Sequence, residues 1–310
     1  MGVAETDIQW LSLCVFPAVR SCTCAPIAQA LVLLTDDDDL MHDTPFPVYE
    51  AGSFRYNEEG PTDSPFPPVI LLHGMLGDLS NWVDTIQALA DSGYHVLAPI
   101  IPVYGLSLRK TGVPGLAQVI REFVETLDLG PSILVGNSLG GHIALLYALE
   151  YPEEVAAMVL SGSSGIYEAS LGTGTMRRYD REFIRERTEM TFYDPVHATD
   201  ELVDEMLEIV KDRPRALRLI KIARSADTEI VTDQLPRLDM PTLLVWGRDD
   251  VITPPDVAEE FRDRLANAEL HFIDRCGHAP MIEHPDTFNR LTLDFLDELA
   301  ETVPVSASDA

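Results

Sequence analysis

The sequence predicts an α/β fold in which a mostly parallel central sheet is flanked by helices and interrupted by an inserted helical segment. Two observations predict this class. From Tyr49 onward, short apolar runs alternate with amphipathic ones, which is typical of a parallel sheet whose strands are joined by helices. Between Ser161 and Pro241 this alternation stops, and residues 175–235 are charged, with helical periodicity in places such as 200–210.

Six apolar runs have the length expected of buried strands. In chain order they cover residues 69–72, 95–100, 133–135, 157–161, 242–246 and 270–273. Amphipathic segments between these runs predict the flanking helices. They cover residues 82–90, 116–128, 141–150 and 255–266. Parallel strands need a crossover connection, and these helices would supply it.

One compact domain is expected over residues 45–300, with a helical lid at about 165–235 and a C-terminal tail over 301–310. A chain of 310 residues that is 46% hydrophobic can bury a core of that size. The lid is predicted because residues 175–235 contain no convincing buried strand, and inserted helices commonly shape substrate pockets.

Residues 1–44 differ from the rest of the chain. The segment 8–34 is mostly apolar, which is typical of a signal peptide or membrane anchor, but Glu5 and Asp7 precede it and Pro17 interrupts it. We therefore expect a poorly ordered N-terminal extension, with an anchor or signal as the alternative.

The chain is strongly acidic, with 51 Asp and Glu residues against 22 Lys and Arg residues and a net charge of −29. Nucleic acids and anionic membrane surfaces attract positive charge, so neither is expected as a partner. The acidic residues are spread along the chain, which indicates a solvated surface suited to high salt, with solubility tuning as the alternative. The sequence contains no motif that indicates an oligomeric state.

The four cysteines do not form the pattern of a disulfide scaffold. Cys14, Cys22 and Cys24 lie in the N-terminal extension, and Cys276 stands alone. Cys22 and Cys24 lack a second ligand pair at metal spacing, so we expect no metal site. We expect the cysteines to be reduced thiols, as is usual for a cytoplasmic protein.

The turn Gly136-Asn137-Ser138-Leu139-Gly140 is the most informative stretch of the chain. It follows a predicted strand and precedes a predicted helix, so Ser138 lies on a sharp strand-to-helix turn. Gly136 and Gly140 would relieve crowding around a strained serine and let its hydroxyl project from the sheet edge. Such a serine is a candidate nucleophile, provided that a base can remove its proton.

Candidates for that base and for its supporting acid follow Ser138 in the chain. Asp249 and Asp250 lie in the turn after the strand predicted at 242–246, and His278 lies in the loop after the last predicted strand. The carboxyl ends of parallel strands meet at one edge of a sheet, so these side chains are expected close to Ser138. The imidazole would take the serine proton, and a carboxylate would hold the imidazole in the right tautomer.

Two backbone N–H groups are candidates for an oxyanion hole. One belongs to Leu139, directly after the serine, and the other to Met75, in the loop after the first predicted strand. Gly74 would let this loop turn inward, and His73 would support it. The chemistry needs no metal or organic cofactor, and the expected partner is a small-molecule substrate.

These segments resemble the serine α/β-hydrolases over residues 49–299. HGMLG, GNSLGG, WGRDDVITPP and CGHAPMIEHP match motifs of that superfamily in order and spacing. The resemblance implies the α/β-hydrolase fold, with Ser138 as nucleophile, His278 as base and Asp250 as acid. Asp249 stays open as the alternative acid, because the sequence does not say which of two adjacent side chains points inward.

Other residues near these motifs are expected to be structural. His142 lies four residues into a predicted helix and is expected to be packed. His271 falls within the last predicted strand, and His284 flanks the following helix. Cys276 is expected to be a small buried filler.

Within this superfamily the sequence is most similar to hydrolases that cleave carbon–carbon bonds of ring-fission products. The similarity lies in segments 137–141, 193–195 and 276–278. Those enzymes typically carry an arginine where this chain has Met206 and a tryptophan where it has Ala279. A thioether cannot clamp a carboxylate as a guanidinium does. We therefore expect hydrolysis of a small or medium ester through an acyl-enzyme, with carbon–carbon hydrolysis as the alternative. A non-catalytic ligand receptor on the same fold is the alternative of another class.

Overall fold

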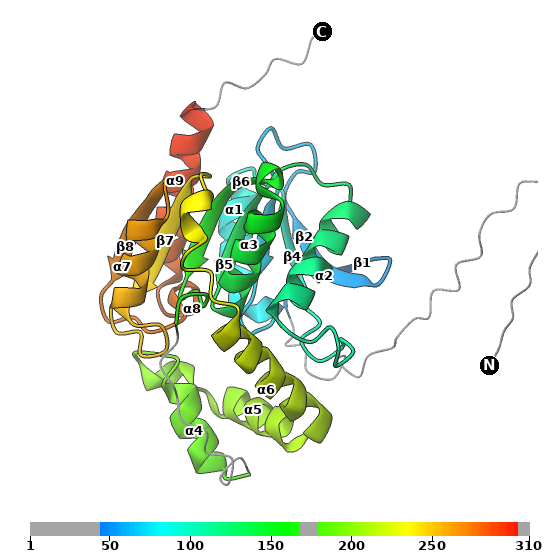
Figure 1. Ribbon diagram of the computed structural model, residues 1–310, viewed down its shortest axis with the longest axis vertical. Coiled ribbons are helices and arrows are strands. Elements are labelled where there is room, and N and C mark those ends of the chain that lie inside the picture. Colours follow the sequence, from blue (N-terminus) through cyan, green and yellow to red (C-terminus); the bar gives the residue numbers. More distant parts are fainter. Residues whose placement is uncertain (1–43, 168–178, 303–310) are drawn as a thin grey trace, which may run out of the picture. The chain divides into compact units, whose positions relative to one another are not determined.

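The computed structural model describes residues 44–167 and 179–302, and its centre is an eight-stranded sheet (Figure 1). The strand order is β1-β2-β4-β3-β5-β6-β7-β8. The strands are β1 (Val48–Ala51), β2 (Phe54–Glu59), β3 (Val69–Leu72), β4 (Val96–Pro99), β5 (Ser132–Asn137), β6 (Val155–Ser161), β7 (Thr242–Gly247) and β8 (Ala268–Ile273). The β1–β2 and β2–β4 pairs are antiparallel, and the remaining pairs are parallel.

The predicted α/β class and all six predicted strands are confirmed. The helices of the described chain are α1 (Val83–Asp91), α2 (Val113–Thr126), α3 (Leu139–Glu150), α4 (Arg181–Glu189), α5 (Asp200–Lys211), α6 (Arg213–Thr228), α7 (Pro255–Arg264), α8 (Pro280–Glu283) and α9 (Pro285–Thr302). The hairpin of β1 and β2 was not predicted. β1 is mostly exposed at the sheet edge, and β2 has the sequence Phe-Arg-Tyr-Asn-Glu-Glu, so neither forms a fully apolar run.

Two hydrophobic cores cover the two faces of the sheet. Alternate residues of each strand point to opposite faces, so Ile70 and Leu72 of β3 join one core while Val69 and Leu71 join the other. The first core is completed by α2, α3 and α7, and the second by α1 and α9 (Figure 1). Helices on both faces explain why the central parallel strands β3, β5, β6 and β7 are almost entirely buried.

The chain between β6 and β7, residues 162–241, is here called the insertion. Its described part contains α4, α5 and α6, which begin after the N-cap residues Asp180, Thr199 and Asp212. The insertion has a small core of its own. That core consists of Ile184, Val203, Met206, Leu207 and Ile209. The helix α6 also packs on the main domain, because Ile222 and Ala226 belong to the first core of the sheet.

Several expectations fall on residues outside the described ranges. They concern the N-terminal extension up to residue 43 with its three cysteines, residues 168–178 of the insertion and the tail from residue 303. Among the residues that are described, no helix combines the length and the apolar character needed to cross a membrane.

Candidate active site

Ser138 occupies the turn between the last residue of β5 and the first residue of α3. Its φ of 55° and ψ of −118° are unfavourable for a residue with a side chain. The backbone is held there from both sides, because the Ser138 N–H donates to the Ser161 carbonyl (3.0 Å) and the Ser138 carbonyl accepts from the His142 N–H (3.1 Å). Ser138 is half-buried, whereas its neighbours Asn137 and Leu139 are buried. The turn therefore presents the hydroxyl at the carboxyl edge of the sheet.

The glycines around Ser138 are required by close backbone contacts. A Cβ atom on Gly140 would lie 2.0 Å from the Leu72 carbonyl oxygen, and one on Gly136 would lie 2.5 Å from the Gly141 nitrogen. Any side chain at either position would push α3 away from the sheet. A Cβ on Gly74 would lie 3.4 Å from the Ser138 Cβ, so the loop after β3 borders the serine directly.

The structure brings Asp250, and not Asp249, to His278. The Asp250 Oδ2 atom lies 2.8 Å from the His278 Nδ1 atom, and both side chains are buried. A carboxylate can only accept, so Nδ1 carries the proton and Nε2 is the ring nitrogen that can accept one. Asp249 is exposed, and its Oδ2 accepts from the Arg275 N–H at 3.1 Å.

Hydrogen bonds from the following turn hold the Asp250 carboxylate in place. Oδ1 accepts from the N–H groups of Ile252 (2.8 Å) and Thr253 (3.0 Å), and Oδ2 accepts from the Thr253 hydroxyl (2.8 Å) as well as from His278. Burial alone would raise the pKa of Asp250. The charge of a protonated His278 and these hydrogen bonds outweigh it, so the pKa of Asp250 is lowered. The carboxylate therefore stays ionised although it is almost inaccessible to water.

Asn137 links the serine turn to the histidine loop. Its Nδ2 group donates to the carbonyls of Ser161 (3.0 Å) and His278 (2.9 Å). Gly162, at a φ of 53°, lies against the imidazole, because a Cβ there would be 2.8 Å from the His278 Nδ1 atom. The loops that carry Ser138 and His278 are thus in contact through side chain and backbone. We call Ser138, Asp250 and His278 the candidate triad.

The proposed oxyanion loop is supported by His73. Its Nδ1 lies 2.8 Å from the Gly74 carbonyl, and its Nε2 accepts from the Ile101 N–H at 3.1 Å. Both ring nitrogens are therefore engaged, burial lowers the pKa of the imidazole, and the ring stays neutral. Met75 follows Gly74 in this loop. Leu139 is the first residue of α3, where a helix leaves its N–H groups without intrahelical acceptors.

The other histidines have partners elsewhere. His142 is fully buried and contacts the Glu229 carbonyl at 2.8 Å, as expected for a packed residue. His271 lies in β8 beside Glu269, and the His284 Nε2 atom lies 2.8 Å from the Arg275 carbonyl.

Cys276 is the buried filler that the sequence predicts. Its side chain is fully buried, and burial, followed by the nearby Glu283 carboxylate, raises the pKa of its thiol far above the ordinary value. The thiol is therefore protonated and unreactive at neutral pH.

Two residues of the site were missed by the sequence analysis. Thr253 supports Asp250, and its hydroxyl also lies 3.3 Å from the His278 Nδ1 atom. Glu283 binds the backbone of the histidine loop at Gly277, with 2.6 Å between Oε1 and the nitrogen. Thr253 lies in the motif WGRDDVITPP and Glu283 in the motif CGHAPMIEHP. Membership of these motifs is the sequence signal that could have identified both residues.

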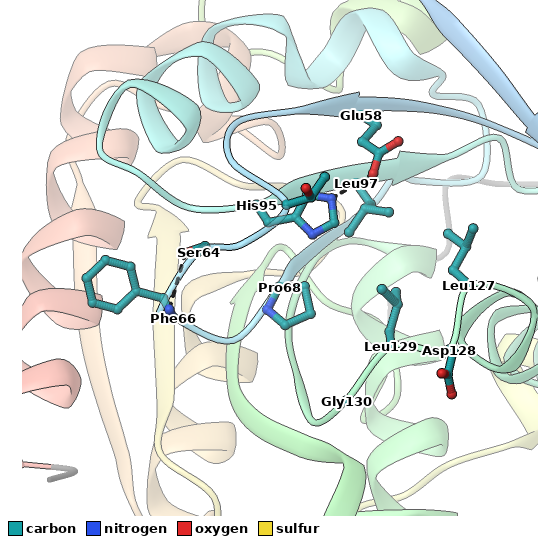
Figure 2. Close-up of a pocket in the computed structure, with 11 residues that line it drawn as sticks. Glu58, Ser64, Phe66, Pro68, His95, Leu97, Leu127, Asp128, Leu129 and Gly130 are labelled. Carbon is teal, nitrogen blue, oxygen red and sulfur yellow. Dashed lines mark hydrogen bonds and ion pairs between the residues drawn. The ribbon is translucent and has the colours of Figure 1, made fainter. Parts of the chain in front are cut away.

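A cavity of about 420 Å³ lies at the opposite edge of the sheet (Figure 2). Its wall includes Pro68 and His95, which directly precede β3 and β4, and Gly130, which lies just before β5. The His95 Nε2 atom contacts Glu58 at 2.8 Å. The candidate triad follows the carboxyl ends of the strands, so this cavity is separate from it.

The chain is similar to known hydrolases over most of its length. The model of the alpha/beta hydrolase family matches residues 69–291. A 2-hydroxy-6-oxononadienedioate/2-hydroxy-6-oxononatrienedioate hydrolase of Pseudomonas sp. is 30% identical over 79% of this chain and 92% of its own. A 2-hydroxy-6-oxo-6-phenylhexa-2,4-dienoate hydrolase of Comamonas testosteroni is 31% identical over 78% and 90%. Among solved structures, an α/β hydrolase enzyme from the metagenome of Mar Chica lagoon sediments in Morocco has a TM-score of 0.67 and 38% identity over 81% of this chain and 98% of that chain. The chain therefore belongs to the α/β hydrolase family.

Proposed function

We propose that this protein is a serine hydrolase that cleaves the carbon–carbon bond of a 2-hydroxy-6-oxo-dienoate. The observation that carries the proposal is the pairing of a buried Asp250–His278 dyad with a strained serine turn, in a chain whose relatives are named for substrates of this class. The relatives favour this substrate over the ester that the sequence analysis places first. Both substrates need the same nucleophile and base.

Each member of the candidate triad has a role that follows from its contacts. Asp250 holds the His278 proton on Nδ1, which leaves Nε2 to take the proton of the Ser138 hydroxyl. The serine oxygen then attacks the substrate carbonyl. The backbone N–H groups of Leu139 and Met75 would stabilise the oxyanion that forms.

Cleavage of a carbon–carbon bond also requires a stabilised carbon leaving group. When the 2-hydroxyl proton of the substrate moves to C5, the resulting 2-ketone is conjugated with the C3–C4 double bond. Attack of Ser138 on C6 and rupture of the C5–C6 bond then place the electron pair on C5, delocalised to the oxygen on C2. That oxygen takes the proton held by His278, and water hydrolyses the remaining acyl-serine. The net reaction adds one water and releases a carboxylic acid and a 2-hydroxydienoate.

Ester hydrolysis is the second candidate function, because two residues depart from carbon–carbon hydrolases. Ala279 follows His278 where a tryptophan is typical of those enzymes. Met206 packs inside the core of the insertion beside Val203 and Ile184, where it offers no charge to a substrate carboxylate. An acyl-enzyme on Ser138 would serve an ester equally well, with an alcohol as leaving group.

We also propose that the insertion acts as a lid over the active site. The support is its direct contact with the histidine loop, because the His278 N–H donates to the Thr191 carbonyl of the insertion at 2.8 Å. A lid in this position would exclude water from the acyl-enzyme until the leaving group has departed.

The substrate class is tested by comparing kcat/KM for 2-hydroxy-6-oxo-6-phenylhexa-2,4-dienoate with kcat/KM for p-nitrophenyl acetate and butyrate. We expect the dienoate to be preferred by roughly 100-fold or more, because the binding energy of its distal groups is used in the transition state. Faster turnover of the esters, with little or no cleavage of the dienoate, would favour the second candidate.

A further inference from the structure

The carboxylate of Glu283 connects the histidine loop to the insertion. Glu283 is the last residue of α8, five positions after His278. Its Oε1 atom accepts from the Gly277 N–H at 2.6 Å. Its Oε2 atom accepts from the N–H groups of Tyr193 (2.7 Å) and Asp194 (3.3 Å), which belong to the insertion. One half-buried carboxylate therefore binds three backbone donors from two separate loops.

The same two loops are also joined through their backbones. The His278 N–H donates to the Thr191 carbonyl at 2.8 Å. Gly277 packs so closely that a Cβ atom there would lie 2.7 Å from the Thr191 oxygen and 2.9 Å from the Tyr193 nitrogen. Residues 191–194 and residues 277–278 are therefore packed together and joined by hydrogen bonds to both the Glu283 carboxylate and the Thr191 carbonyl.

The proposed reaction leaves two segments of the motifs unexplained. One is Tyr193-Asp194-Pro195 in the insertion, and the other is the Glu283 position of CGHAPMIEHP. The structure brings them together through the Glu283 carboxylate. The Asp194 side chain is used separately, since its Oδ1 accepts from the Val196 N–H at 3.0 Å.

We propose that Glu283 is a positioning residue that aligns His278 by tying its loop to the insertion. This inference rests on the proposed role of His278 as base. A carboxylate offers two oxygens, and charge-assisted hydrogen bonds to backbone N–H groups are stronger than neutral ones. The insertion must be seated on residues 277 and 278 for these bonds to form. Seating of the proposed lid and alignment of the base are thus one event.

The test uses the full-length Glu283→Gln, Glu283→Ala and Ser138→Ala variants, with Glu259→Gln as matched control. Glu259 is exposed on α7. A glutamine at position 283 has nearly the same size but only one acceptor oxygen, so it cannot bind both loops. Titration of Ser138 to completion with a fluorophosphonate counts the competent sites. The labelling rate, kcat per titrated serine and amide hydrogen exchange of residues 191–194 and 277–278 are then measured.

We expect Glu283→Gln to lower both kcat per titrated serine and the labelling rate by roughly 10- to 100-fold, as for a catalytic group displaced by about 1 Å. KM should stay within about twofold, and amide exchange in both segments should become faster. Glu283→Ala should show a larger effect of the same kind, and Glu259→Gln should show none.

A purely structural Glu283 would reduce the number of titrated sites and leave kcat per site within about twofold. That result in Glu283→Gln would overturn the inference, even if Glu283→Ala failed to fold. The Ser138→Ala variant separates this outcome from failure of the proposed function. Wild-type turnover by Ser138→Ala would refute the triad itself, whereas an inactive Ser138→Ala beside a normal Glu283→Gln would refute only the role of Glu283.

Discussion

Asp249 and Asp250 are neighbours in the chain but differ completely in their surroundings. Asp250 is 2% exposed and accepts hydrogen bonds on both oxygens, whereas Asp249 is exposed and contacts the backbone of Arg275. The turn that ends at Thr253 decides which carboxylate faces His278. This geometry depends on contacts within the folded loop, so the sequence left the two residues as alternatives.

The two aspartates can be tested as a matched pair. Asp250→Asn should lower kcat by roughly 10⁴-fold, because an amide facing Nδ1 favours the wrong tautomer of His278. Asp249→Asn should leave kcat within about threefold, because it removes an exposed charge that does not contact the imidazole. Steady-state kinetics of both variants on 2-hydroxy-6-oxo-6-phenylhexa-2,4-dienoate give the two kcat values. Equal losses in the two variants would contradict the assignment of the acid.

The sequence predicted the parts of the site that depend on local motifs. Ser138 and His278 could be located because each follows a recognisable strand and lies beside glycines that the turn requires. Thr253 and Glu283 were missed because their role lies in contacts that become visible only when distant loops meet. The Glu283 partners Tyr193 and Asp194 lie about ninety residues earlier in the chain.

Secondary-structure elements were predictable where both faces are buried. The strands β3, β5, β6 and β7 consist mainly of buried apolar residues because helices cover both sides of the sheet. The hairpin of β1 and β2 escaped prediction because both strands mix polar or charged residues with apolar ones. The insertion could be predicted because the strand pattern stops there. Its packing against the histidine loop could not be predicted, because that packing depends on contacts between distant segments.

His142 links α3, the helix that follows Ser138, to the residue after α6. Its Nε2 atom contacts the Glu229 carbonyl, which can only accept, so Nε2 carries a proton. Burial lowers the pKa of His142 to about 4, against a weaker opposing effect of this hydrogen bond. In the unfolded chain the imidazole has its ordinary pKa of about 6.5. Between about pH 4 and pH 6.5 the unfolded state therefore binds more protons than the folded state. Stability from a neutral His142 is complete above about pH 6.5 and is lost as the pH falls toward 4.

We therefore expect the free energy of unfolding of the wild type to fall by about 2 to 3 kcal/mol between pH 7.5 and 4.5 through His142 alone. His142→Gln keeps a donor for the Glu229 carbonyl but does not titrate, so its stability should depend less on pH by that amount. Urea unfolding followed by tryptophan fluorescence at the two pH values measures the difference. Identical pH dependence in wild type and variant would show that His142 is not held neutral.

The whole molecule carries a net charge of −29. Its excess carboxylates repel one another, and this repulsion destabilises the folded state. Salt reduces this repulsion, because the screening length falls from about 10 Å at 0.1 M to about 3 Å at 1 M. Salt also weakens attractive surface pairs such as Arg181 with Asp204. Both partners of that pair are exposed, and such pairs contribute little to stability. Relief of repulsion should therefore dominate.

Raising KCl from 0.1 M to 3 M should increase the melting temperature by roughly 5 °C or more. Thermal scans at constant pH and protein concentration measure this change. A constant or falling melting temperature would instead mean that the acidic surface serves solubility without adaptation to salt.

Ser138 is the proposed nucleophile in cleavage of the carbon–carbon bond. The most direct test of this role is the rate of benzoate release from 2-hydroxy-6-oxo-6-phenylhexa-2,4-dienoate by the wild type and by Ser138→Ala. The acyl part that forms on the serine becomes benzoate, so the product reports the proposed bond cleavage itself. We predict steady release by the wild type and a rate at least about 10³-fold lower for Ser138→Ala. Equal rates in the two proteins, or no benzoate from the wild type, would contradict this role of Ser138.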